Sequence, residues 1–136
     1  MGCNDGAAGA KGVTLIELLV VIAMLGILAS AAYPIYTDQV LKAHRQQAQT
    51  DLLKIQLALE QGFFDGYQPH GIVSAGACLI CGGDSQHYQF TIEVDEAGYH
   101  IFASPQHAQG KDKCEGERYD HLSLNERGEH LPSKCW

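Results

Sequence analysis

The 136-residue chain has about the length of one domain, with 46% hydrophobic and 18% charged residues. Disordered and collagen-like chains contain fewer apolar residues, so both classes are excluded. Nine lysines and arginines against sixteen aspartates and glutamates give a formal net charge of −7. This balance excludes a generally basic nucleic-acid-binding surface and leaves room only for a local patch. Five cysteines in so short a chain indicate an oxidising compartment or a metal site.

An apolar segment begins at Val13, after a small and polar stretch, residues 1–12, that has no hydrophobic periodicity. Between Val13 and Ala32 the only charged residue is Glu17. About 20 apolar residues are enough to cross a bilayer as a helix, so the sequence predicts a membrane-spanning helix here. Lys11 is the only base ahead of the segment, which favours a cytoplasmic N-terminus.

Two simpler interpretations of this segment stay open on these residues alone. One is a cleaved secretory signal, because Ala29-Ser30-Ala31 resembles a signal-peptidase site, and the other is an uncleaved anchor. Neither gives a partner to Glu17, although a carboxylate at mid-bilayer costs roughly 2.5–3.5 kcal/mol. A cut just before Val13 would supply that partner, because the new α-amino group carries a positive charge.

Residues 11–20, KGVTLIELLV, resemble the cleavage and N-methylation motif of type IV pilins and pseudopilins. The resemblance implies that a prepilin peptidase removes the leader, residues 1–12, by cutting after Gly12. It also implies that Val13 becomes the N-methylated first residue, where the family usually has phenylalanine. Glu17 matches the family's glutamate five residues into the mature chain. By resemblance, Glu17 pairs with the Val13 amine of a neighbouring subunit during assembly.

A helix is expected to follow the motif, with helix breaks at Gly26 and Pro34. Both residues, together with Tyr36, stand where many type IV pilins carry glycine, proline and an aromatic residue. We expect a hydrophobic transmembrane and filament-core helix at residues 13–34 and an amphipathic helix at residues 35–62. Helical spacing places five apolar residues on one stripe of the second part: Leu41, Ala48, Leu52, Ile55 and Leu59. The other face carries Gln39, Gln46, Gln49, Gln56 and Glu60.

Short alternating segments in the second half predict a small antiparallel sheet. A glycine-rich connection, residues 62–85, leads into four expected strands: Tyr88–Val94, Tyr99–Ala103, His121–Leu124 and Glu129–Leu131. Laying this meander on the helix stripe buries both apolar faces. The predicted fold class is therefore α+β, a long N-terminal helix packed on a small antiparallel β-meander. Residues 63–136 form the expected periplasmic, surface-exposed head domain.

The C-terminal half also resembles that of PilE-type minor pilins. The matching pieces are Tyr99–Ala103, Lys113-Cys114, the segment 122–129 and the terminal Cys135-Trp136. This resemblance implies a disulfide between Cys114 and Cys135 that bounds a C-terminal surface loop.

Cys78-Leu79-Ile80-Cys81 is a C-x-x-C motif with three interpretations. A thiol oxidoreductase site needs a helix after the motif, but glycines follow it. A zinc knuckle needs a second C-x-x-C or paired histidines, and neither occurs at that spacing. A local disulfide between Cys78 and Cys81 is the favoured interpretation, although four cysteines in the mature chain allow three connectivities. We expect neither a metal nor a cofactor.

Seven histidines are scattered along the chain and are expected at the surface: His44, His70, His87, His100, His107, His121 and His130. We expect three of them, His87, His100 and His121, on one exposed sheet face, where they give weak metal affinity. No Ser-His-Asp order, P-loop or paired-carboxylate pattern stands out in the sequence, so no enzymatic activity is expected.

These patterns together predict a minor type IV pilin, a structural subunit of type IV pili with roles in twitching motility, adhesion or DNA uptake. Expected partners are sister pilins through helix–helix packing, the prepilin peptidase, the inner-membrane assembly platform and the membrane itself, with no general nucleic-acid binding. The precursor is expected in the inner membrane, with a cytoplasmic N-terminus and a periplasmic head, and later in pili on the cell surface. The alternatives are a type II secretion pseudopilin, a secreted soluble binding domain freed at Ala31, and a thiol oxidoreductase.

Overall fold

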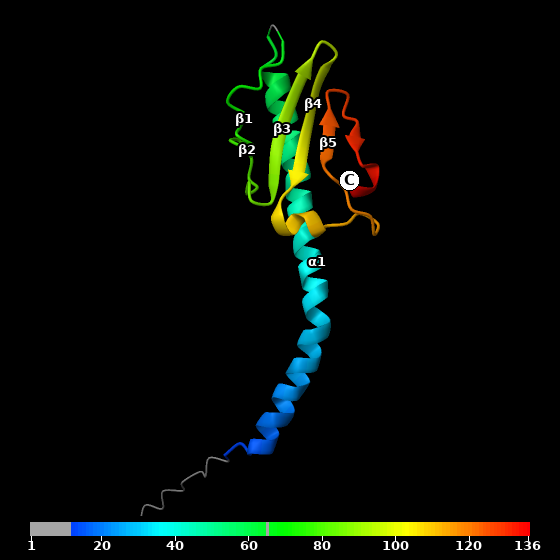
Figure 1. Cartoon of the computed structure of the whole chain (residues 1–136). Coiled ribbons are helices and arrows are strands. Elements are labelled where there is room, and N and C mark those ends of the chain that lie inside the picture. Colours follow the sequence, from blue (N-terminus) through cyan, green and yellow to red (C-terminus); the bar gives the residue numbers. More distant parts are fainter. Residues whose placement is uncertain (1–11, 65) are drawn as a thin grey trace, which may run out of the picture. The chain divides into compact units, whose positions relative to one another are not determined.

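The structure, a computed structural model, describes residues 12–64 and 66–136 (Figure 1). Most of the expected leader, including Lys11, lies outside the described residues. The chain divides into two compact units, residues 1–36 and residues 37–136.

One α-helix, α1 (Leu15–Gln61), contributes to both units. Thr14 caps its start, because the hydroxyl Oγ1 of Thr14 accepts a hydrogen bond of 3.3 Å from the backbone N–H of Glu17. The expected breaks do not occur as helix ends, since α1 runs through both Gly26 and Pro34. A proline removes one backbone donor, and the apolar and alanine-rich residues on both sides still favour the helix.

The first unit presents a helix surface that this unit does not cover. Every large apolar side chain from Val13 to Leu28 is exposed, from 44% at Val20 to 82% at Leu15. Among the described residues, α1 is the one helix long and apolar enough to cross a membrane. Such a surface is unstable in water, so it needs lipid or other apolar helices around it.

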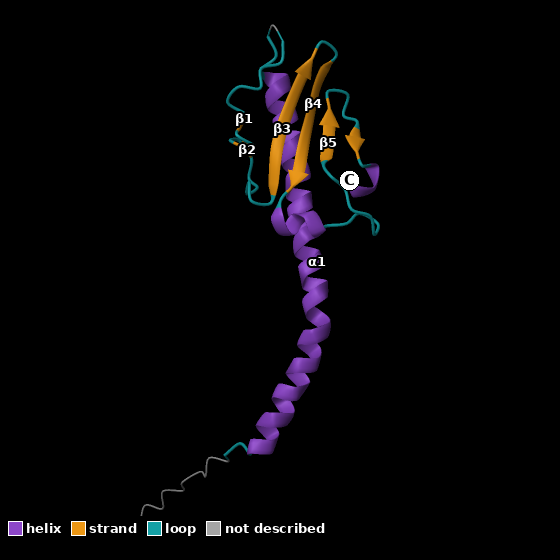
Figure 2. Ribbon diagram, viewed as in Figure 1, coloured by secondary structure: helices purple, strands orange, loops and turns teal. Residues whose placement is uncertain are grey.

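The second unit packs the remaining part of α1 on a four-stranded antiparallel sheet (Figure 2). Its strands follow one another in chain order: β3 (Tyr88–Asp95), β4 (Gly98–Pro105), β5 (Leu122–Asn125) and β6 (His130–Leu131). This order is the predicted meander. Two short strands, β1 (Val73–Ser74) and β2 (Ala77–Cys78), pair within the glycine-rich connection and were not predicted. Two 3₁₀ turns, η1 (His107–Lys111) and η2 (Ser133–Cys135), complete the unit.

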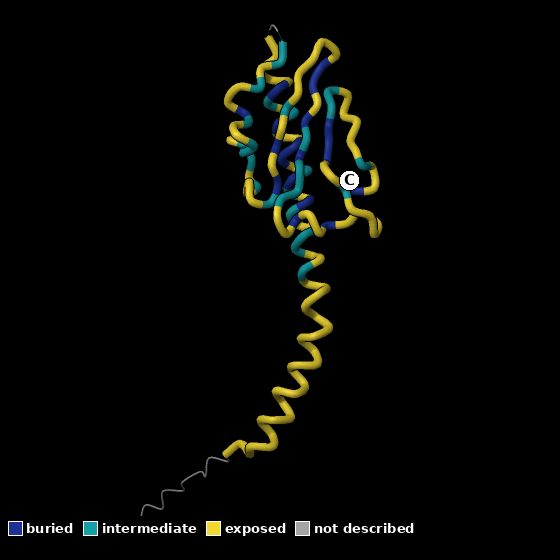
Figure 3. The backbone as a smooth tube through the Cα atoms, in the orientation of Figure 1, coloured by how far each residue is buried: buried dark blue, intermediate teal, exposed yellow. Residues whose placement is uncertain are grey.

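The core lies between the helix stripe and the inner face of the sheet (Figure 3). Four of the five predicted stripe residues are buried there, namely Ala48, Leu52, Ile55 and Leu59, whereas Leu41 at the edge is only half-buried. They pack with Tyr88, Phe90, Tyr99, Ile101, Leu122 and Leu124 from the strands. The predicted α+β architecture is therefore confirmed.

Two glutamines of the expected polar face lie against the sheet instead of in water. The side-chain amide of Gln56 donates to the carbonyl oxygen of Asn125 at 3.1 Å, and that of Gln49 donates to the carbonyl oxygen of Cys135. The β5–β6 end of the sheet and η2 cover more of the helix than one apolar stripe. The polar residues at the border of the stripe therefore bind backbone groups of these elements.

Candidate functional site

A groove with several cationic side chains lies at the end of the second unit where its part of α1 begins. We call it the basic groove; it encloses about 560 Å³. Five cations line it: Lys42 and Arg45 from α1, and Lys111, Lys113 and Arg118 from the segment between β4 and β5. Three carboxylates, Asp38, Asp112 and Glu115, lie among them. The groove is thus a local excess of positive charge on a chain whose net charge is −7.

A buried ion pair holds the two walls of the basic groove together. The guanidinium Nη1 of Arg45 lies 2.9 Å from Oδ2 of Asp112, and both side chains are more than 90% buried. The same nitrogen donates to the carbonyl oxygen of Lys113 at 3.0 Å. Arg45 therefore fixes the loop beside η1 to the helix, and most of its charge is neutralised.

Asp112 is also the centre of a polar network beneath the groove. It accepts a hydrogen bond of 2.7 Å from the hydroxyl of Tyr119, which lies 2.5 Å from the hydroxyl of Tyr88. Gln109, 1% exposed, donates from Nε2 to the carbonyl oxygen of Leu41 at 2.8 Å. Burial raises the pKa of both Tyr88 and Tyr119, so both phenols stay protonated. The network fixes the backbone that carries Lys111 and Lys113.

The predicted disulfide between Cys114 and Cys135 is present and lies beside this network, with Cα atoms 5.1 Å apart. It closes the loop that carries Arg118. A surface ion pair supports the same loop, since Nζ of Lys134 lies 2.9 Å from Oε2 of Glu117. This pairing lowers the pKa of Glu117 and raises that of Lys134.

The C-x-x-C motif forms the local disulfide between Cys78 and Cys81. The motif begins at the end of β2 and continues into a glycine turn, where Gly82 and Gly83 donate backbone hydrogen bonds to the carboxylate of Asp51 at 3.1 and 2.9 Å. Asp51 is fully buried, and it also accepts from Lys54 at 3.1 Å. An oxidoreductase site requires a helix that begins at the motif. The described residues 82–87 that follow Cys81 form turns and bends instead.

Only two of the three histidines expected on one face of the sheet lie near each other. The ring centroid of Phe102 in β4 lies 6.2 Å from that of His100 in the same strand and 5.1 Å from that of His121, the residue before β5. His87 does not join them, because it precedes β3 in a turn and stacks on His44 of α1. The residues that the structure describes contain no group of three histidine, cysteine or carboxylate side chains able to hold a metal ion.

The residues expected to direct processing and assembly lie in the first unit. Val13 is 72% exposed, and Glu17 is exposed in the first turn of α1. The buried Arg45–Asp112 pair was not predicted. Its signal in the sequence is the position of Arg45, four residues after Leu41 and three before Ala48, which puts a charge on the apolar stripe.

Comparison with known proteins assigns both parts of the chain. Residues 8–33 match the family model described as the prokaryotic N-terminal methylation motif. Residues 34–117, more than half of the chain, match the model described as type IV minor pilin ComP, DNA uptake sequence receptor. The chain belongs to the type IV pilin family. Members of this family are structural subunits rather than enzymes, and they assemble with other pilin subunits.

Individual relatives of this pilin agree with the assignment. The chain is 41% identical over 59 residues to the type IV major alpha-pilin of Moraxella bovis, covering 43% of this chain and 37% of the relative. It is 34% identical over 70 residues to the fimbrial protein FimA of Dichelobacter nodosus, covering 52% and 41%. The type II secretion system core protein G of Pectobacterium carotovorum is 38% identical over 64 residues, covering 43% and 41%. The matches thus span less than half of each relative, and no solved structure gives a significant match.

Proposed function

We propose that this pilin is a minor type IV pilin, a non-enzymatic subunit incorporated into surface pili. The observation that carries this proposal is the fully exposed apolar helix of the first unit, directly after a prepilin motif. The precursor resides in the inner membrane, with its N-terminus in the cytoplasm and its head in the periplasm. The apolar helix then exchanges lipid for sister helices, so the free energy of burying it changes little on assembly.

Processing and register follow from residues of the first unit. Prepilin peptidase cuts between Gly12 and Val13, and the new amine of Val13 is methylated. In a filament, Glu17 pairs with the Val13 amine of a neighbouring subunit, because an acid in an apolar environment is stable only with a positive partner. The inner-membrane assembly platform is the expected site at which the apolar helix leaves the lipid and joins its sister helices.

The head favours a minor pilin over a type II secretion pseudopilin. Support comes from the match of residues 34–117 to a minor-pilin model and from the two disulfides of the head. The relatives include major pilins and a secretion-system protein, and they match less of the chain than that model does.

The proposed pilin function is tested by determining the N-terminal residue of the protein and by locating the protein in sheared pili. Intact mass and N-terminal sequencing should give a chain that starts at Val13 with a methylated amine. Immunogold labelling should place the head on the filament. A mature chain that starts at Ala32, or an unprocessed Met1 in assembled pili, contradicts the proposal.

Capture of double-stranded DNA is a second role, favoured by the basic groove and by the DNA-receptor description of the matched family model. Lys42, Lys111, Lys113 and Arg118 offer phosphate contacts from one surface. Such binding is local, and it weakens steeply with salt because each neutralised phosphate releases counterions. The overall acidic charge keeps nucleic acid away from the rest of the head.

Fluorescence anisotropy with a labelled duplex tests this second role. The double variant Lys111→Glu/Arg118→Glu should lose most of the affinity and show a smaller salt dependence. Arg127→Glu is the matched control, because Arg127 is an exposed cation in the turn between β5 and β6, away from the groove. Equal losses in both variants contradict DNA binding in the basic groove.

A further inference from the structure

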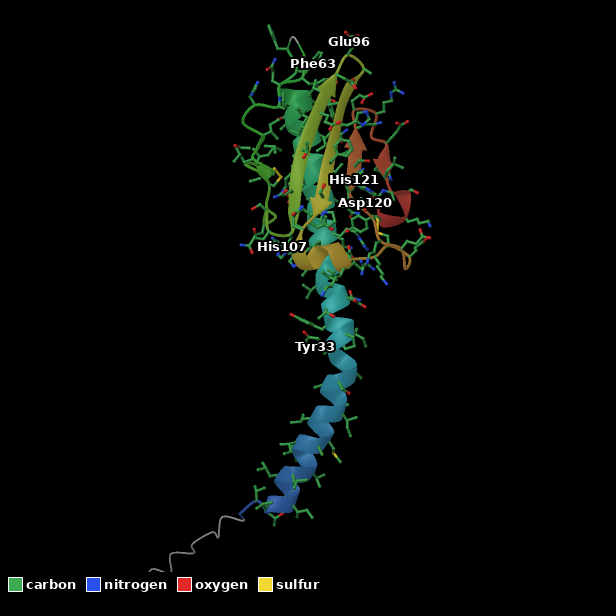
Figure 4. All side chains as sticks on the ribbon, in the orientation of Figure 1. Tyr33, Phe63, Glu96, His107, Asp120 and His121 are labelled. Carbon is green, nitrogen blue, oxygen red and sulfur yellow. A yellow bond between two sulfur atoms is a disulfide. The ribbon has the colours of Figure 1, made fainter. Side chains whose placement is uncertain are left out.

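An aromatic and acidic surface lies at the end of the second unit opposite the basic groove. We call it the acidic cap and define it by Phe63, Phe64, Glu60, Glu96 and Glu126. Figure 4 shows Phe63 and Glu96 together at one end of this unit and His107 of η1 at the other. Phe64 is 97% exposed and Phe63 is 54% exposed, which is unusual for two adjacent aromatic side chains in water.

Packing inside the head holds the parts of the acidic cap together. The hydroxyl of Tyr99 donates to Oε1 of Glu60 at 2.7 Å, which ties the end of α1 to β4. The ring of Tyr67 lies 4.6 Å from that of Tyr99 and 4.8 Å from that of Phe63. Phe63 is therefore anchored on the aromatic side chains of the head, and the neighbouring Phe64 extends into solvent.

The acidic turns of the cap also lie against each other. The carboxylate of Glu126, in the β5–β6 turn, fits where Gly98 has no side chain, since a Cβ on Gly98 would lie 2.8 Å from Oε2. Gly98 has a φ of +145°, which favours glycine. Glu96 is two residues before Gly98 in the same β3–β4 turn. The contact between Glu126 and Gly98 thus holds the two turns that carry Glu96 and Glu126 next to each other.

The two ends of the second unit carry opposite charge. Asp95 and Glu129 stand beside the same turns and add to the three carboxylates of the acidic cap, whereas the cation Arg127 pairs with Glu126 at 3.2 Å. In the basic groove, Arg45 and Asp112 neutralise each other. Four cations remain there, Lys42, Lys111, Lys113 and Arg118, against Asp38 and Glu115.

We propose that the acidic cap of one copy of this chain docks into the basic groove of a second copy. Phe64 would occupy the centre of the contact, against the apolar side chain of Leu41 in the groove, with the glutamates of the cap facing the lysines around it. An aromatic centre with a charged rim is the usual construction of a specific protein interface. Opposite charges at the rim set the register and speed association.

The contact is heterologous, because it joins two different surfaces at opposite ends of the same unit. After one contact forms, one copy still has a free groove and the other still has a free cap, so contacts of this kind build an open row rather than a closed dimer. The inference rests on the proposed pilin function, since an open row is what a filament subunit needs. It also means that a docked cap and bound DNA compete for the same lysines.

A charge exchange between the two surfaces tests the proposal. The processed full-length chain is kept in detergent micelles, and its self-association is measured by sedimentation at low and high salt. The groove variant Lys111→Glu/Arg118→Glu and the cap variant Glu96→Lys/Glu126→Lys should each weaken self-association about tenfold or more. An equimolar mixture of the two variants should restore it, because each reversed surface then meets one of opposite charge. A mixture that stays as weak as the separate variants overturns the proposal.

The centre of the contact has its own variant and control. Phe64→Ser should weaken self-association, whereas Leu79→Ser should not, although Leu79 is also apolar and 60% exposed. A chain with both Phe64→Cys and Lys111→Cys should form a ladder of crosslinked multimers with a short thiol crosslinker. A chain with Leu79→Cys and Lys111→Cys is the matched control. Crosslinking that stops at the dimer, or equal ladders in both chains, contradicts the heterologous contact.

The measurements separate the cap–groove contact from the proposed pilin function. The cap variant should keep its affinity for duplex DNA, and the mixture should regain self-association without the groove variant regaining DNA binding. A protein that is processed at Val13 and found in pili, yet self-associates equally in all variants, remains a pilin without the cap–groove contact. A protein that is not processed at Val13 fails the proposed function itself.

Discussion

The imidazole rings of His44 and His87 stack on each other, with centroids 3.8 Å apart and planes 24° apart. This contact joins α1 to the turn that leads into β3. Burial lowers the pKa of His44 from its ordinary value of 6.5, and the neighbouring His87 lowers it further, while Asp84 opposes both. His44, His87 and Asp51 line one small pocket. The carboxylate of Asp51 is already paired with Lys54, whose Nζ lies 3.1 Å from Oδ1. The stacked pair is therefore stable when His44 is neutral.

The stack predicts that the head loses stability as the pH falls. Because the pKa of His44 is lower in the folded chain, the unfolded chain binds more protons as the pH falls below about 6.5. The free energy of unfolding should be largest above this pH and should decrease below it. Thermal unfolding followed by the fluorescence of Trp136, the only tryptophan, measures the effect.

The variant His44→Gln should flatten this pH dependence, while the exposed His70→Gln should leave it unchanged. Equal slopes in the wild type and in His44→Gln would mean that another group causes the loss.

Breaking the buried pair between Arg45 and Asp112 should destabilise the head strongly. Removing one partner of a buried ion pair leaves the other charge unpaired, which typically costs about 3–5 kcal/mol. Arg45→Met should therefore unfold at much lower denaturant concentration than the wild type. The comparison is Lys134→Met, which breaks the exposed pair with Glu117 and should cost no more than about 1 kcal/mol. Similar losses in the two variants would show that the buried pair contributes no more to stability than the exposed pair does.

Periodicity and alternation predict much of this head. The stripe of Leu52, Ile55 and Leu59 is visible because helical spacing repeats along one segment, and β3 is visible because its side chains alternate. A contact such as Arg45–Asp112 joins residues 67 positions apart, so no local pattern contains it. The spacing of Arg45 places it on the stripe, but only the structure shows that it is buried and which group compensates its charge.

Glycine-rich segments are where the sequence predicts least. The strands β1 and β2 have two residues each and follow no alternation that a short window can detect. The predicted start of β3 at Tyr88 is correct, and His87, the residue before it, belongs to the preceding turn and not to the sheet. The basic groove is equally hard to predict, because Lys111, Lys113 and Arg118 come from the segment between β4 and β5, which only the folded chain brings to α1.

The variant Gly83→Ala should destabilise the turn after the Cys78–Cys81 disulfide. A Cβ on Gly83 would lie 2.6 Å from Oδ2 of Asp51, and that carboxylate cannot move aside because four hydrogen bonds fix it in the core. Overpacking of this kind costs about 1–3 kcal/mol. Gly110→Ala is the matched control, since a Cβ there meets nothing within 4 Å. If both variants have the melting temperature of the wild type, the carboxylate of Asp51 is not held rigidly in the core.

The two disulfides should differ in their contribution to stability. Cys114 and Cys135 are 21 positions apart, whereas Cys78 and Cys81 are three apart, and the longer loop restricts the unfolded chain more. Replacing both cysteines of the longer loop by serine should cost about 2–5 kcal/mol, typical of small secreted domains. The serine pair at 78 and 81 should cost less. Denaturant unfolding of both double variants decides the ranking, and equal midpoints would contradict it.

Glu17→Val should leave the precursor in the membrane but exclude it from pili. In lipid, removing a lone carboxylate eases insertion by up to roughly 3 kcal/mol, so the membrane-bound amount should not fall. In the filament, the Val13 amine of the neighbouring subunit loses its partner, and an unpaired charge in an apolar environment opposes assembly. A loss of 1.4 kcal/mol already lowers incorporation about tenfold. Ser30→Ala is the control, because Ser30 is an uncharged polar residue on the same exposed helix. Its hydroxyl donates a hydrogen bond to the carbonyl oxygen of Ile27 in the preceding turn. Immunoblots of membranes and of sheared pili measure both amounts, and wild-type incorporation of Glu17→Val would refute the pairing.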